Sequence, residues 1–66
     1  MAKDIYWLYL DDSAESQAAE ETLRSKGVTP RTIWNPAGYD RLPSLEVGSQ
    51  TFNGLAAIQF YVADRL

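Results

Sequence analysis

The first segment of the chain limits its possible folds most strongly, because residues Ile5 to Leu10 form an uninterrupted apolar run, IYWLYL. A half-exposed strand would alternate apolar and polar residues, so this run predicts a strand that is covered on both faces and lies in the centre of a sheet. It is far shorter than the roughly 20 residues that a membrane span needs. Because the sequence also lacks the pattern of a signal peptide, we expect a cytoplasmic protein.

A helix is predicted directly after this strand, from Ser13 to Gly27, because the segment consists mostly of strong helix formers. Asp12 and Glu15 have capping-box spacing, Ser13 is the alternative N-cap, and Gly27 occupies the position of a C′ glycine. The apolar face of this helix is narrow, so the helix is expected to lie close against the sheet. That face consists mainly of Ala14, Ala18, Ala19 and Leu23.

Two further segments follow the predicted helix. Residues Val28 to Asn35 predict a second strand, and Pro30, which has no N–H to donate, places it at or near an edge of the sheet. The turn-forming residues from Pro36 to Arg41 then predict a loop.

The last part of the chain predicts a β-hairpin and a helix. Ser44 to Val47 alternates, with Leu45 and Val47 directed inward, and a loop of about three residues leads to a short segment, Thr51-Phe52. From Leu55 to Leu66, apolar residues recur at spacings typical of one helix face. These residues are Leu55, Ile58, Val62 and Leu66.

The predicted order of elements is therefore β-α-β followed by β-β-α. A strand, a helix and a parallel strand form a right-handed crossover, and the hairpin with its covering helix completes the sheet. The sequence thus predicts an α/β domain over residues 1–66, with a mixed four-stranded sheet and helices packed on it.

Composition removes several kinds of chemistry. The chain has no cysteine and no histidine, which excludes disulfides, zinc and iron–sulfur sites of the usual ligand types, and nucleophilic triads that use histidine. Nine acidic residues against six basic ones give a net charge of −3, so neither nucleic acid nor a membrane surface is expected as a partner. Asp11-Asp12 could be taken for Mg²⁺ ligands, but we interpret them as stabilising the helix N-terminus and expect no metal and no cofactor.

This layout resembles the thioredoxin fold, and in particular the short glutaredoxin-like proteins. Counting back from Gly27, the two positions of the family's C-x-x-C motif are occupied by Ser13 and Ser16. Leu42-Pro43 matches the cis-proline that opens the family's third strand, and Asn53-Gly54 matches the glycine motif that closes the fourth. The resemblance implies a thioredoxin-like β-α-β-β-β-α fold, in which the family's second helix is reduced to the loop from Pro36 to Arg41.

The missing cysteines determine what activity the resemblance implies. Dithiol exchange needs a thiolate, which a serine hydroxyl cannot replace, so we do not expect an enzyme in this form. Glutathione binding is doubtful, because Leu55, Ala56 and Ala57 stand where the family usually has an Asp or Thr that holds the tripeptide. The backbone of Leu42 remains able to pair with an extended peptide.

Two functional hypotheses follow from this resemblance. The first is a small binding or regulatory module for a protein or peptide partner. Its contact surface is expected to comprise Ser13, Glu15, Ser16, Leu42, Pro43, Asn53 and Gly54. The second is a thiol-disulfide oxidoreductase represented by a Ser-for-Cys form. For Ser13 and Ser16, simple helix capping is a third interpretation.

Overall fold

The structure is a computed structural model that describes residues 5–66, and it contains the predicted order of elements, β-α-β-β-β-α. The elements are β1 (Tyr6–Leu10), α1 (Ala14–Ser25), β2 (Arg31–Trp34), β3 (Ser44–Val47), β4 (Gln50–Asn53) and α2 (Leu55–Arg65). β2 is shorter than the predicted strand. Neither helix in the described part of the chain is long and apolar enough to cross a membrane.

The four strands form one mixed sheet in the order β2-β1-β3-β4. β1 runs parallel to β2 and antiparallel to β3, and β3 and β4 form the hairpin. The central position of β1 and the edge position of β2 are therefore as predicted. The hairpin turn consists of two residues, Gly48 and Ser49, rather than about three, and Gly48 supplies the positive φ of +60° that this tight turn requires.

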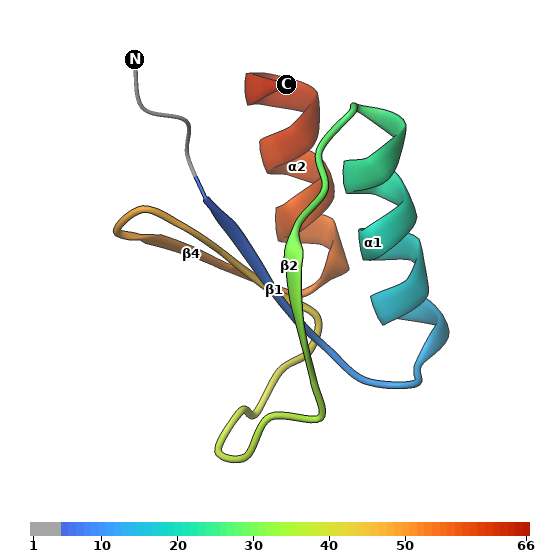
Figure 1. Cartoon of the computed structure of the whole chain (residues 1–66), viewed down its shortest axis with the longest axis vertical. Coiled ribbons are helices and arrows are strands. Elements are labelled where there is room, and N and C mark those ends of the chain that lie inside the picture. Colours follow the sequence, from blue (N-terminus) through green and yellow to red (C-terminus); the bar gives the residue numbers. More distant parts are fainter. Residues whose placement is uncertain (1–4) are drawn as a thin grey trace.

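Both helices pack on one face of the sheet, and the hydrophobic core lies between them and the strands (Figure 1). β1 contributes Leu8 and Leu10, which are fully buried, and β3 contributes Leu45 and Val47. The helices complete the core with Ala19 and Leu23 from α1, and with Ile58, Tyr61 and Val62 from α2.

The prediction that both faces of β1 are covered is wrong. Successive side chains of a strand point to opposite faces, so burial alternates: Leu8 and Leu10 are buried, whereas Trp7 and Tyr9 are only half-buried and Ile5 is exposed. No helix in the described chain lies on that second face. On that face the aromatic rings are partly covered, Tyr9 by Tyr39 of the loop and Trp7 by the Arg31 guanidinium.

Helix α1 ends at the predicted glycine, but of the two predicted N-caps it uses the alternative, Ser13, and the Asp12–Glu15 capping box does not form. Ser13 is its N-cap, with an extended backbone at φ −70° and ψ 158°, and Gly27 follows the last turn with a φ of +79°. The predicted apolar face is only partly correct, because Ala14 is exposed while Ser16 is buried in its place. The first turn is rotated so that a hydroxyl, rather than this alanine, faces the end of β1.

The segment between β2 and β3 contains no helix, as the sequence predicts for this loop. It ends at the Leu42–Pro43 peptide bond, which is cis. Figure 1 shows this loop at the same end of the molecule as the connection from β1 to α1. The residues proposed as a contact surface therefore belong to segments that share one end of the domain.

Candidate functional site

The predicted contact residues fall into two groups at this end of the molecule. The first group surrounds the N-terminus of α1 and contains Ser13 and Ser16. The second lies where β4 meets the start of β3 and contains Pro43, Asn53 and Gly54. Within the described residues, no hydrogen bond or ion pair joins one group to the other. Glu15 belongs to neither network and is exposed on the first turn of α1.

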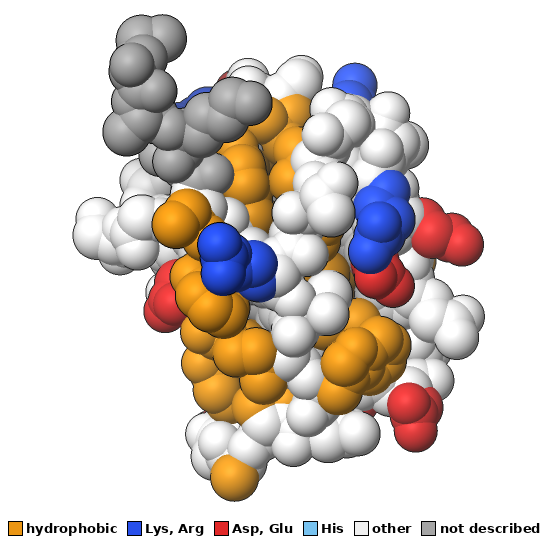
Figure 2. Space-filling view, viewed as in Figure 1, with side chains coloured by type: hydrophobic (Ala, Val, Ile, Leu, Met, Phe, Trp, Pro, Cys, Tyr) orange, Lys and Arg blue, Asp and Glu red, His pale blue; other side chains and the backbone are white. Residues whose placement is uncertain are grey.

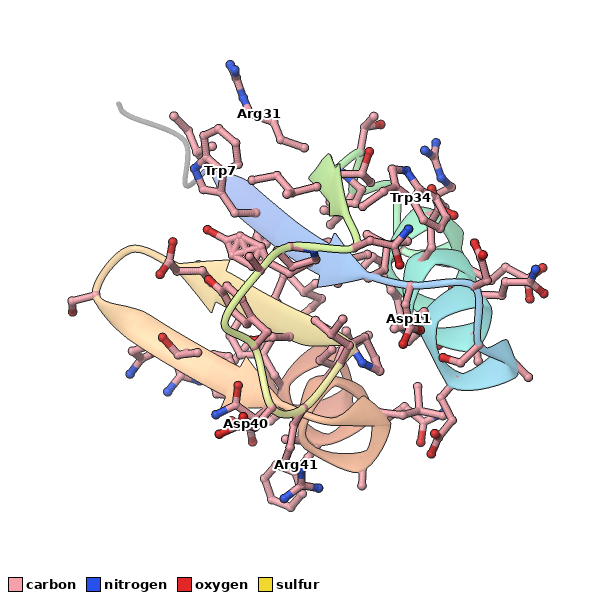
Figure 3. The ribbon with its side chains drawn as sticks, turned by 90° about the horizontal axis from the view of Figure 1, so that it is seen from below. Trp7, Asp11, Arg31, Trp34, Asp40 and Arg41 are labelled. Atoms are coloured by element: carbon pink, nitrogen blue, oxygen red, sulfur yellow. The ribbon has the colours of Figure 1, made fainter. Side chains whose placement is uncertain are left out.

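The first group is a closed set of hydrogen bonds, here called the serine cap, formed by Asp11, Ser13 and Ser16. Asp11 Oδ1 accepts from the backbone N–H of Ser13 at 3.0 Å and from the hydroxyl of Ser16 at 2.8 Å. In return, the N–H of Asp11 donates to Ser16 Oγ at 3.0 Å, and the N–H of Ser16 donates to Ser13 Oγ at 3.1 Å. The serine cap therefore ties the end of β1 to the beginning of α1 (Figure 3).

The polar groups of the serine cap already bond to one another. Ser16 is 0% exposed and its hydroxyl both donates and accepts, whereas Ser13 is half-buried. Hydrogen bonding by Ser13, and then by Ser16, lowers the pKa of Asp11 below its ordinary value. The anion that the positive end of a helix favours is thus supplied by the chain itself. This geometry agrees with the helix-capping interpretation of both serines.

The second group is held together across the hairpin. The N–H of Gly54 donates to the carbonyl of Pro43 at 2.7 Å, and the hydroxyl of Ser44 donates to Asn53 Oδ1 at 2.8 Å. Pro43 is buried, and Asn53 is exposed. These contacts fix the cis-proline segment against the end of β4, where α2 begins.

Gly54 is the N-cap of α2, and no other residue fits its position well. Its φ is +91°, and a Cβ added there would lie 3.0 Å from Nη2 of Arg41. Figure 3 shows Arg41 beside the first turn of α2. An open hollow of about 280 Å³ adjoins this contact. Its walls are formed by Gly38, Tyr39, Asp40, Arg41 and Asn53.

The backbone of Leu42 lies between these fixed points. This residue is half-buried, yet neither its N–H nor its carbonyl forms a hydrogen bond within residues 5–66. The next carbonyl along the chain, that of Pro43, is paired with Gly54. Leu42, in the bend that leads into β3, therefore has one backbone donor and one acceptor without a partner in the described chain, and such groups can pair with another segment.

Sequence reasoning missed two residues of this region. Asp11 was assigned a general role at the helix N-terminus rather than its specific bonds to two serines; the signal was an Asp placed two residues before a serine N-cap, the spacing of a local Asx turn. Arg41 was treated as part of a loop, and no local signal indicates its contact with Gly54. No cluster of three or more acidic side chains suited to a metal ion occurs in the described chain.

Comparison of the chain with protein-family models, with curated proteins and with solved structures finds no match.

Proposed function

We propose that this chain is a small peptide-binding module with a glutaredoxin-like architecture and without redox chemistry. The observation that carries the proposal is the unpaired backbone of Leu42, which directly precedes Pro43, whose carbonyl is bonded to the N–H of Gly54. The order of elements and the strand order β2-β1-β3-β4 are compatible with the thioredoxin-like topology that the resemblance implies. We assign Asn53 and Ser13, one from each of the two groups described above, to the edges of the peptide site.

Redox chemistry is disfavoured by the serine cap as well as by the missing thiols. Ser13 and Ser16 have no histidine to activate them, and the Asp11 carboxylate, which accepts from the N–H of Ser13 and from the hydroxyl of Ser16, is a weak base because its pKa is lowered. A hydroxyl whose proton already serves a structural hydrogen bond is a poor nucleophile. Recognition through backbone hydrogen bonds requires no such group and suits the residues that are present.

The direct test is an NMR titration of the ¹⁵N-labelled protein with a blocked, extended octapeptide library, followed at the Leu42 amide. We expect chemical-shift changes at Leu42, Asn53 and Gly54, and slower hydrogen exchange of the Leu42 N–H as peptide is added. A peptide-saturated protein in which the Leu42 amide still exchanges at its free rate would contradict the proposal. Glutathione serves as the comparison ligand, for which we expect no comparable change.

A thiol-disulfide oxidoreductase represented by its Ser-for-Cys form is the second candidate. It is favoured by the closeness of Ser13 and Ser16 at the positive end of α1, where the N–H of Ser16 donates to Ser13 Oγ at 3.1 Å. The double variant Ser13→Cys/Ser16→Cys is expected to form an intramolecular disulfide under mild oxidant. Thr22→Cys/Ser25→Cys has the same spacing in the same helix, lacks the extended N-cap backbone, and is expected to remain reduced.

The two candidates are separated by the codons of the natural gene and by the redox behaviour of the double variant. Cysteine codons at positions 13 and 16 would favour the oxidoreductase. Serine codons, together with an engineered disulfide that lacks exchange activity with a dithiol substrate, would favour the binding module. If Ser13→Cys/Ser16→Cys forms no disulfide at all, the alignment of these two serines with a C-x-x-C motif is wrong.

A further inference from the structure

The face of the sheet that no helix covers carries an apolar surface, which we call the open face. Strand alternation places Trp7 and Tyr9 there, the exposed Ile5 directly precedes β1, and Ile33 lies beside Tyr9 on β2. Tyr39 from the loop packs on Tyr9, with the ring centroids 4.7 Å apart. Figure 3 shows Trp7 on the side of the sheet away from both helices, and Figure 2 shows hydrophobic side chains gathered over the strands.

This surface is apolar over β1 and β2, whereas β3 and β4 contribute polar residues to the same face, Ser44, Glu46, Thr51 and Asn53. Ile5 is 53% exposed, Tyr39 40% and Ile33 36%. Sheets with one solvated face normally place polar residues on it. Exposed apolar side chains rimmed by polar residues are a feature of surfaces at which proteins associate.

Two opposite charges flank the centre of the open face. The pairing register aligns Trp7 with Arg31 on β2 and with Glu46 on β3, so the three residues form one row across the sheet. The Arg31 guanidinium lies 5.6 Å from the centroid of the Trp7 ring and forms no ion pair within the described chain. Glu46 is held by the hydroxyl of Tyr9, which donates to its Oε1 at 3.1 Å. The row therefore consists of a cation, an aromatic ring and an anion, in the order Arg31, Trp7, Glu46.

We propose that a second copy of this chain covers the open face, in a homodimer whose twofold axis lies between the two sheets and runs along β1. This rotation keeps β1 above β1 and exchanges the two sides of the row. Arg31 of each copy then faces the partner's Glu46, and the two Trp7 rings meet at the centre. The same patch serves both copies, as an isologous interface requires.

The charge pattern selects the direction of the axis. An axis across the strands would set β2 above β2 and bring the two Arg31 side chains together, which opposes association. With the axis along β1, Arg31 of each copy faces Glu46 of the other copy, which gives two pairs of opposite charges. Packed sheets keep their strands within about 30° of each other, so twist alters this pairing little over a distance of one strand.

The open face is small, which indicates weak association. Strand spacings of about 4.8 Å and rises of about 3.3 Å per residue make the sheet face roughly 19 Å by 15 Å, or about 300 Å² per copy before side-chain relief is counted. Stable specific interfaces bury about 800 Å² per partner. We therefore expect a weak dimer that dissociates on dilution.

Sedimentation velocity from about 10 μM to about 1 mM protein tests the proposal. We expect the wild type to shift from monomer towards dimer, and Arg31→Glu or Glu46→Arg alone to weaken association by about tenfold or more. An equimolar mixture of the two variants must restore it, because the mixed dimer has opposite charges at both contacts. Lys26→Glu and Glu21→Arg make the same charge changes elsewhere, and neither they nor their mixture should alter association.

A second pair of variants keeps the test valid if loss of the Tyr9–Glu46 hydrogen bond impairs folding. Ile33→Glu places a charge on the open face, and Phe60→Glu makes the same change at a residue that is 75% exposed on α2. Only Ile33→Glu should weaken the dimer. A monomer throughout the concentration range, a dimer broken by Phe60→Glu instead, or a charge-variant mixture that stays monomeric although both variants are folded would each overturn the proposal.

Discussion

The two faces of the sheet are formed by alternate residues of the same strands, and they differ in what they contact. On the covered face, Leu8 and Leu10 are fully enclosed by α1 and α2. On the open face, Trp7 and Tyr9 are only half-buried, and no helix of the described chain covers them; their contacts include Arg31, Tyr39 and Glu46. The difference shows that hydrophobic content alone does not determine burial: the number and position of the helices decide which half of an apolar strand becomes core.

The largest expected effect tests this contrast directly. Leu8→Ala should destabilise the domain by about 2–5 kcal/mol, because it removes buried methyl groups and leaves a cavity between the sheet and the helices. Ile33→Ala, on the partly exposed second face, should cost less than about 1 kcal/mol in the monomer. Urea unfolding at low protein concentration measures both. Equal losses would mean that the open face is covered within one chain.

A smaller effect is expected from the polar groups at the end of the covered face. Ser16→Ala leaves the N–H of Asp11 without its acceptor and the Asp11 carboxylate without one donor, so we expect a loss of about 1–3 kcal/mol. Ser13→Ala removes the N-cap and should cost about 1 kcal/mol. Ser25→Ala, on the exposed last turn of α1, is the matched control and should be nearly neutral. If Ser16→Ala is also neutral, the serine cap does not stabilise α1.

On the open face, the hydrogen bond from Tyr9 to Glu46 should contribute less to stability, and its contribution should be lost at high pH. Burial, and then hydrogen bonding with Tyr39 and Glu46, raises the pKa of Tyr9 to about 12. Because the unfolded tyrosine loses its proton near pH 10, this contribution to stability is present below about pH 10 and is lost as the pH rises towards 12. An ultraviolet titration should show one tyrosine ionising last. Tyr9→Phe should remove that step and cost about 0.5–1.5 kcal/mol.

The smallest expected effect is a dependence of stability on acid, which comes from Asp11 in the serine cap. The pKa of Asp11 is lowered in the folded state, so its contribution is present above the unfolded value of about 3.9 and is lost as the pH falls through the lower folded value. Urea midpoints measured in acid should therefore fall more steeply for the wild type than for Asp11→Asn. Parallel curves for the two proteins would remove Asp11 as a source of the acid sensitivity.

Much of the fold could be predicted because its signals are local. Helix formers between Ser13 and Gly27, the proline before β2 and the alternation of Ser44 to Val47 each identified an element within a few residues. Burial was harder to predict. The run at Ile5 to Leu10 contains three aromatic residues, which tolerate half-exposed positions, and nothing in the sequence shows that Tyr39 will cover Tyr9 from a distant loop.

The candidate site divides in the same way. The N-cap role of Ser13 follows from helix-start chemistry, but the complete burial of Ser16 depends on Asp11 turning back from β1. The contact of Arg41 with Gly54 and the unpaired backbone of Leu42 depend on how a loop crosses the sheet. Such contacts arise from tertiary packing, which residue spacing does not encode.

The strand order affects how the chain folds while it is being synthesised. Within this domain β1 leaves the ribosome before its neighbours in the sheet, which come from residues 31–34 and 44–47, and part of its cover comes from residues 55–65. The β1-α1-β2 unit can assemble early, whereas the core remains open until α2 has been made. Over that interval the most apolar segment of the protein is only partly protected, and nascent chains are most exposed to chaperones and to aggregation.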